Sequence, residues 1–131
     1  MKYANARSGD GRGQMRERQR RDRAATQPLR VRFPQFASLR LDFDFSDDGR
    51  FTPAPQVTVL HPPASAYFIF PCPYTDCDGE FNLEPVVNTL ATAEQASDEG
   101  QLRCSGHRSG SGENRAACQL ILEYNIIAKR S

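Results

Sequence analysis

Four cysteines constrain the fold of this chain more than any other feature of its sequence. Cys72 and Cys77 have four residues between them, and Cys104 and Cys118 follow after 26 more residues, with thirteen between the second two. The first pair lies in "FPCPYTDCDGEF", where prolines, acidic residues and a glycine supply the chemistry of a tight turn. A chain of 131 residues has room for one modest hydrophobic core, and proteins with small cores often need a metal site or disulfides for stability.

Alternating patterns predict a mainly β (α+β) domain over residues 29–131. "ASLRLDFDF" sets Leu39, Leu41, Phe43 and Phe45 against polar neighbours, as a half-buried strand of an antiparallel sheet does. Further strands are expected at residues 56–61, 65–71, 80–83, 100–104 and 118–128, with the last of them central in the sheet. Residues 84–97 predict one short helix, and Gly100 is its expected stop.

The strand pattern explains how the distant second cysteine pair comes together. If residues 100–104 and 118–128 are antiparallel neighbours, the Gly/Ser-rich segment between them closes a hairpin. Cys104 and Cys118 then face each other at the strand ends. Four thiolates suit a tetrahedral zinc ion, so these four cysteines are predicted to hold structural Zn²⁺.

The arrangement over residues 66–124 resembles zinc ribbons and related small zinc-bound β-domains. It shares with them a close cysteine pair after a strand and a second pair that closes a hairpin. The chain differs in having four residues, not two, between Cys72 and Cys77, and in spreading its second pair over a long loop. The resemblance implies a zinc-stapled β-scaffold.

The sequence also permits other uses of the cysteines. His107 follows Cys104 closely and is an alternative fourth ligand in place of Cys118. Two disulfides, or free thiols buried as small apolar groups, are the non-metal alternatives. We expect no enzymatic activity and no small-molecule substrate, because the sequence contains no catalytic grouping or nucleotide-binding motif.

Charge is distributed very unevenly along the chain. Residues 1–32 carry ten Lys/Arg against three Asp/Glu, whereas residues 33–99 carry two against eleven. Residues 1–28 are almost without apolar side chains, and we expect them to form a disordered Arg-rich arm. The segment "MRERQRRDRAA" within the arm has the composition of a helix that forms against a partner.

The arm predicts contact with RNA or with a nucleoprotein assembly. Guanidinium groups pair with phosphates, and the arginines expected to do so are Arg16, Arg18, Arg20, Arg21 and Arg23. An acidic protein surface is the alternative partner, and an inert tail or one folded onto this protein's own acidic body is the non-functional interpretation. A protein-interaction adaptor, with zinc purely structural, is the competing function.

Features of membrane or secreted proteins are missing from the sequence. No run approaches the roughly 20 apolar residues of a membrane span. The first residues, "MKYANARSGDGRGQ", lack the apolar middle of a secretory signal, so we expect a cytoplasmic protein without membrane contact.

Overall fold

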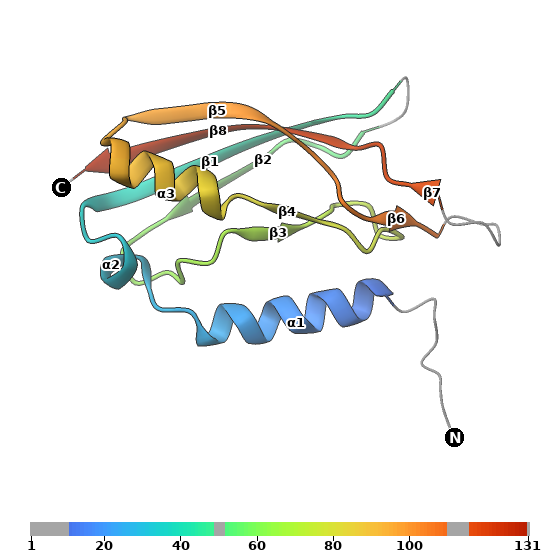
Figure 1. The fold of residues 1–131 in the computed structure, drawn as a ribbon, viewed down its shortest axis with the longest axis horizontal. Helices are drawn as coiled ribbons and strands as arrows, with labels where there is room; N and C mark the ends of the chain where they lie inside the picture. Colours follow the sequence, from blue (N-terminus) through green and yellow to red (C-terminus); the bar gives the residue numbers. More distant parts are fainter. Residues whose placement is uncertain (1–10, 49–51, 110–115, 131) are drawn as a thin grey trace.

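A four-stranded antiparallel sheet dominates the computed structural model, which describes residues 11–48, 52–109 and 116–130. Its strand order is β2-β1-β8-β5 (Figure 1). The strands are β1 (Phe36–Ser46), β2 (Gln56–Leu60), β5 (Ser97–Arg103) and β8 (Ile121–Arg130). The prediction of a mainly β domain around a small antiparallel sheet is therefore confirmed.

The two long central strands follow the alternation of their sequences. In β1, Leu39 and Leu41 are fully buried while Arg40 between them is exposed, as period-two alternation requires. β8 pairs with β1 on one side and with β5 on the other, so the predicted central position of the last strand is confirmed. The pairing of β5 with β8 is also the one that the sequence predicted.

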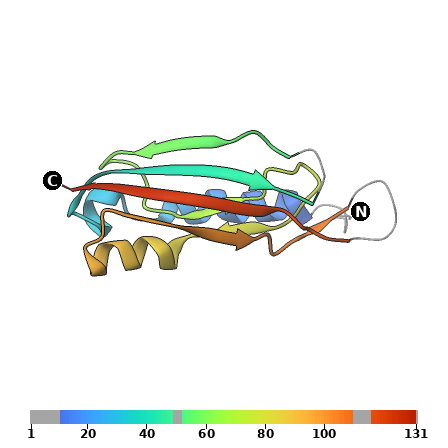
Figure 2. The ribbon, with the colours of Figure 1, turned by 90° about the horizontal axis from the view of Figure 1, so that it is seen from above.

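A second layer covers the apolar face of the sheet. It comprises the two-stranded ribbon of β3 (Ile69–Pro71) and β4 (Glu80–Asn82), together with helix α3 (Glu84–Ala93), which packs beneath β5 (Figure 1 and Figure 2). The core between the layers contains Phe68, Phe81, Leu83, Val87 and Leu90, all of them buried. A third pair of strands, β6 (His107–Arg108) and β7 (Ala116–Ala117), lies at one end of the molecule.

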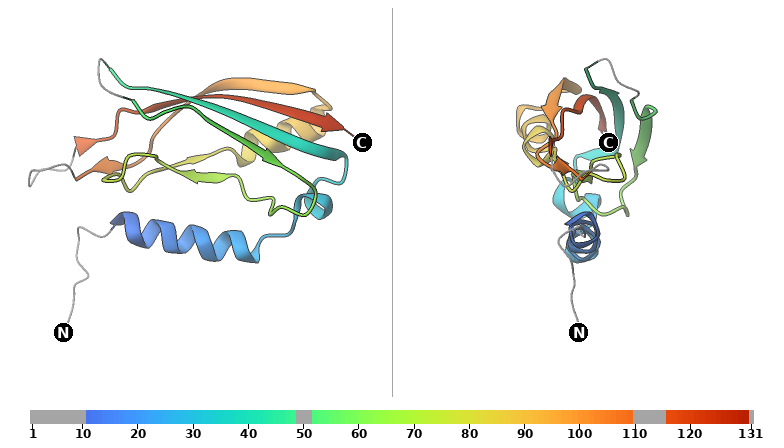
Figure 3. Two further views of the ribbon diagram at one scale, coloured as in Figure 1. Left: turned by 180° about the vertical axis from the view of Figure 1, so that it is seen from behind. Right: turned by 90° about the vertical axis from the view of Figure 1, so that its right-hand side faces the viewer.

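Two helices precede the first strand. α1 (Gly11–Ala25) lies along the β3–β4 ribbon on the side away from the large sheet, as Figure 1 and Figure 3 both show. α2 (Leu29–Arg32) is a single turn that buries Leu29 completely. The expectation of disorder is wrong for residues 11–25, because Met15 and Gln19 pack into the body and make the helix part of the fold. Residues 1–10 of the predicted arm lie outside the described residues.

The ends of several helices and strands differ by a few residues from those predicted from the sequence. α3 ends at Ala93, where Glu94 adopts a left-handed conformation at φ 56°, so Gly100 is not its stop. Gly100 instead lies within β5 opposite Tyr124. The strand predicted over residues 65–71 is regular only at Ile69–Pro71. Ser65 forms an isolated antiparallel bridge with Pro28, and the carbonyl of Phe68 accepts a hydrogen bond from the amide of Leu83 at 2.8 Å.

Within the described residues, no helix is long and apolar enough to cross a membrane.

Candidate metal centre

The four cysteines converge on one buried point. Their Sγ atoms all lie within 4.8 Å of one another, and all four residues are buried. The Sγ atoms of Cys77 and Cys104 are 3.5 Å apart, and those of Cys72 and Cys118 are 3.9 Å apart. These separations bracket the distance of about 3.8 Å between sulfurs at the corners of a tetrahedron with Zn–S bonds of about 2.3 Å.

Strand ends place the sulfurs at this point. Cys72 directly follows β3, and Cys77 lies shortly before β4, so the ribbon brings the first pair together. Cys104 directly follows β5, and its amide donates to the carbonyl of Leu120 at 3.0 Å, which continues the β5–β8 pairing toward Cys118. The predicted hairpin mechanism for the second pair is thus the one observed.

Two Cys-x-Gly turns form the centre of the site. The amide of Gly79 donates to the Sγ of Cys77 at 3.3 Å, and the amide of Gly106 donates to the Sγ of Cys104 at 3.4 Å. One half of the site contains Cys72 and Cys77, and the other contains Cys104 and Cys118. In the first half the amide of Cys72 donates to the carbonyl of Gly79 at 3.0 Å, and in the second the amide of Cys118 donates to the carbonyl of Gly106 at 2.9 Å. The two halves of the site therefore repeat the same hydrogen-bond scheme.

The packed thiols perturb one another. Hydrogen bonds from the neighbouring thiols of Cys104 and Cys72, together with the amide of Gly79, lower the pKa of Cys77 to about 2. Hydrogen bonds with the thiols of Cys104 and Cys77 raise the pKa of Cys72, while burial raises the pKa of Cys118. Without a cation, one thiolate suppresses ionisation of its neighbours, because like charges at this distance repel. A metal ion offsets this repulsion between thiolates, since it binds them directly through its positive charge.

Polar contacts enclose the cysteine turns. Nη1 of Arg12, from the start of α1, donates to the carbonyl oxygens of Cys72 at 2.8 Å and Cys77 at 3.0 Å. Nε of Arg108 donates to the carboxylate of Asp76 at 2.8 Å, and its guanidinium stacks on the ring of Tyr74 at 3.7 Å. These contacts hold the outside of the Cys72–Cys77 turn.

His107 lies beside the centre but not in it. Its backbone N–H donates to Asp78 Oδ1 at 2.8 Å, and its carbonyl accepts from the amide of Asp78 at 3.3 Å. The residue is exposed, and it does not belong to the group of converging metal-ligand atoms, in which Cys118 occupies the fourth position. That group is the one cluster of three or more candidate ligands within the described ranges.

The residues present fit a structural zinc ion. Four thiol sulfurs within 4.8 Å of one another form a closed donor set, which is the composition of structural sites rather than of catalytic ones. Amide donors to the sulfurs of Cys77 and Cys104 would stabilise thiolate charge at those two corners. The cysteines are unpaired in the structure, with sulfurs well beyond the S–S bond length of about 2.0 Å.

The predicted phosphate-binding arginines divide into two groups on α1. Arg18 forms an ion pair with Glu80 of β4, and its contact is therefore directed at the body. Arg16, Arg20 and Arg23 line a hollow of about 310 Å³ beside Pro71, and Arg21 is exposed. Arg20 also pairs with Glu17 on the same helix, and Arg23 stacks over the ring of Tyr67 at 5.1 Å.

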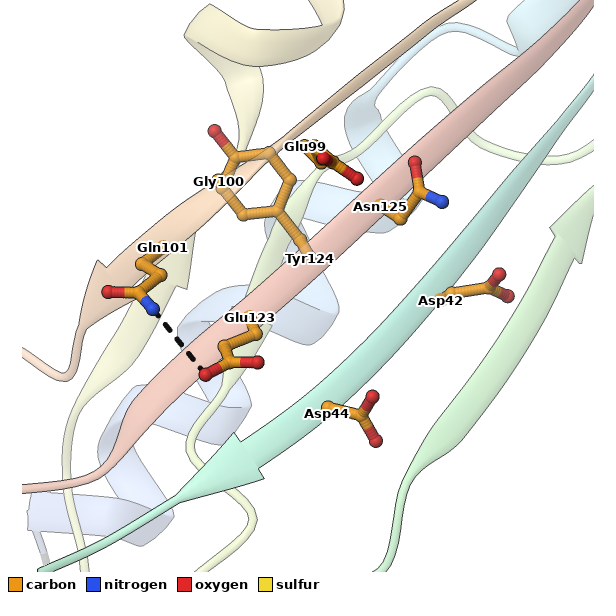
Figure 4. Close-up of a pocket in the computed structure, with 8 residues that line it drawn as sticks. All are labelled: Asp42, Asp44, Glu99, Gly100, Gln101, Glu123, Tyr124 and Asn125. Atoms are coloured by element: carbon orange, nitrogen blue, oxygen red, sulfur yellow. Dashed lines mark hydrogen bonds between the residues drawn. The ribbon is translucent and has the colours of Figure 1, made fainter.

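A second hollow, of about 540 Å³, lies on the polar face of the large sheet (Figure 4). Two cross-strand rows form it: Asp42 faces Asn125, which faces Glu99, and Asp44 faces Glu123, which faces Gln101. Gln101 donates a hydrogen bond of 3.4 Å to Glu123. This face is acidic, and Asp44 lies directly opposite the like charge of Glu123.

Sequence reasoning missed three contributors to the metal centre. Arg12 lies in the basic segment of the sequence, and its carbonyl partners lie 60 and 65 residues away along the chain. Gly79 and Gly106 lie in segments that the sequence marks only as turn and loop. The repetition of Cys-x-Gly at Cys77 and Cys104 was the available signal for their shared role.

Comparisons with known proteins identify no relative: the chain matches no family model, no curated protein and no solved structure. The zinc-ribbon resemblance therefore stays a prediction, and the assignment of function depends on the site itself.

Proposed function

We propose that this chain is a non-enzymatic zinc-binding accessory protein that contacts RNA through helix α1. Cys72, Cys77, Cys104 and Cys118 hold a structural Zn²⁺, which fixes the ends of β3, β4, β5 and β8. The convergence of four buried sulfurs within 4.8 Å of one another is the observation that carries the zinc part of this proposal.

The exposed arginines of α1 support the RNA part. Arg16, Arg20 and Arg23 are spaced at i, i+4 and i+7, so they share one face of the helix and line one hollow. Guanidinium groups so aligned match successive phosphates of a nucleic-acid backbone and release counterions on binding. Arg18 and Arg12 are directed at the protein body, and the proposed contact set is therefore Arg16, Arg20, Arg21 and Arg23.

The test measures binding of a fluorescent single-stranded RNA as a function of salt concentration. Replacing Arg16, Arg20 and Arg23 by alanine should weaken binding and reduce the salt slope by about 2, at roughly 0.7 for each phosphate that is no longer neutralised. The matched control replaces Arg40, Arg103 and Lys129, which removes the same charge from the strands of the large sheet. If both variants weaken RNA binding equally, or if neither variant changes it, α1 is not the RNA-binding element.

The competing function is a protein-interaction adaptor with zinc purely structural. The placement of Asp44 opposite Glu123 favours it, because like charges directly across a sheet destabilise the pair and a basic partner would relieve that repulsion. A lysine-rich peptide should then bind the native protein and lose affinity for the variant with Asp44→Asn and Glu123→Gln. RNA binding that persists in that variant would separate the two functions.

A further inference from the structure

Helix α1 is held on the protein by very little apolar surface. Every residue of this helix is described by the structure, and Met15 is its one buried apolar side chain. The other buried residue is Gln19, whose amide reaches Glu80 at 3.4 Å, and Arg18 reaches the same carboxylate. A helix with so small an apolar stripe depends on polar contacts for its position, since burial alone contributes little.

One of these polar contacts is made to the metal-binding turn. Nη1 of Arg12 bridges the carbonyls of Cys72 and Cys77, at 2.8 and 3.0 Å, in a partly buried setting. Both acceptors belong to the two cysteines that span the turn, so their separation depends on where the two sulfurs are held. Hydrogen bonds with a charged donor are about twice as strong as neutral ones.

Charge adds to this geometric dependence. Four thiolates around Zn²⁺ carry a net charge of −2, and the guanidinium of Arg12 lies against the backbone of two of the four ligands. Without the metal, the site does not hold four thiolates together, because like charges at this distance repel, so the attraction on Arg12 is weaker. Arg12 therefore has stronger contacts in the metal-loaded protein, both electrostatically and geometrically.

We infer that metal occupancy and the docking of α1 are coupled through Arg12. Loss of zinc releases the helix that carries the proposed RNA contacts, and docking of the helix in turn increases the affinity for zinc, because coupling between two sites is reciprocal in binding free energy. Figure 3 shows α1 alongside the ribbon whose ends carry Cys72 and Cys77. This inference rests on the zinc part of the proposed function and is independent of the RNA part.

The experiment uses the full zinc-loaded chain and two measurements made without RNA. The first is the affinity for zinc, measured by equilibrium competition with a colorimetric chelator, and the second is amide hydrogen exchange of residues 11–25. Arg12→Ala should bind zinc about tenfold more weakly, as removal of a group that supports the metal ligands typically does. It should also increase exchange in α1 while exchange in β1 and β8 stays as in the native protein.

Matched variants on the same helix separate coupling from general loosening. Arg16→Ala, which changes an exposed arginine of the hollow, should leave both measurements unchanged. Arg18→Ala weakens docking at Glu80 without touching the cysteine carbonyls, and reciprocity requires it to lower the affinity for zinc as well. Arg12→Lys, which restores the charge but not the planar fork, should fall between Arg12→Ala and the native protein.

The outcomes are distinct. Native zinc affinity in both Arg12→Ala and Arg18→Ala would overturn the coupling and leave the zinc site in place. If Arg12→Ala does not fold, Arg18→Ala alone decides. A native chain that binds no zinc would defeat the proposed function itself, and that result is read from the metal content before any affinity is measured.

Discussion

Gly79 and Gly106 meet backbone to backbone beside the four sulfurs. A Cβ atom on Gly106 would lie 2.2 Å from the backbone nitrogen of Gly79, and one on Gly79 would lie 2.3 Å from the Sγ of Cys104. The two Cys-x-Gly turns can therefore approach each other only because neither glycine has a side chain. This contact joins the β3–β4 ribbon to the end of the large sheet.

Replacing either glycine should damage the centre. Gly79→Ala or Gly106→Ala forces backbone atoms apart, and we expect a loss of stability of about 3 kcal/mol, at the upper end for overpacking, with faster release of zinc. Thermal unfolding and chelator transfer measure the two effects. Gly100→Ala is the control: its Cβ would meet the hydroxyl of Tyr124 at 2.6 Å, which is the far end of a side chain that can move. Equal losses in all three variants would contradict the special role of the paired turns.

Removing one ligand should unfold the protein. Binding of structural zinc supplies on the order of 10 kcal/mol, which is comparable with the entire stability of a small domain. Cys72→Ser, Cys77→Ser and Cys118→Ser should therefore lose both zinc and the cooperative unfolding transition seen by circular dichroism.

His107→Ala is the control for the ligand set. Its backbone, not its ring, makes the contacts to Asp78, and the residue is exposed, so its replacement should change the free energy of unfolding by less than about 0.5 kcal/mol. Retention of zinc by Cys118→Ser, together with its loss from His107→Ala, would make the histidine the fourth ligand.

The metal content predicts a simple mass signature. Under native conditions the chain should be heavier by one zinc ion, and denaturation should return the mass of the fully reduced chain with four free thiols. A chain lighter by four hydrogens and free of metal would instead contain two disulfides. That mass would exclude both the zinc scaffold and the coupling of α1 to it.

Tyr74 predicts an alkaline loss of stability. Burial and the hydrogen bond of its hydroxyl to Asp47 Oδ2, at 2.7 Å, raise its pKa from 10.0 to about 12. Since the folded protein holds this proton more tightly than the unfolded chain, the contribution is complete below pH 10 and is lost as pH rises toward 12. Tyr74→Phe should flatten the fall in urea-unfolding free energy between pH 10 and 12. An identical slope in the variant would assign that fall to other groups.

Local periodicity explains which parts of the fold could be predicted from the sequence. The alternation around Leu39, Leu41 and Phe43 identifies the inward face of β1 without reference to any other segment. The same holds for Leu122 and Ile126 of β8. The strand pattern also predicted that the second cysteine pair comes together, because pairing of β5 with β8 brings Cys104 to Cys118.

The amino-acid sequence was sufficient to predict the inward faces of the long strands, the pairing that closes the second cysteine pair and the identity of the four candidate ligands. The folded structure was needed to establish that α1 is a docked helix, that Gly79 and Gly106 touch, and that Arg12 caps the cysteine turn. Strand faces arise from interactions between neighbours two residues apart, whereas the Arg12 contacts join residues 60 and 65 positions apart. No local pattern records contacts of that range, since they exist only once the ribbon and the sheet have brought their backbone carbonyls and amides into place.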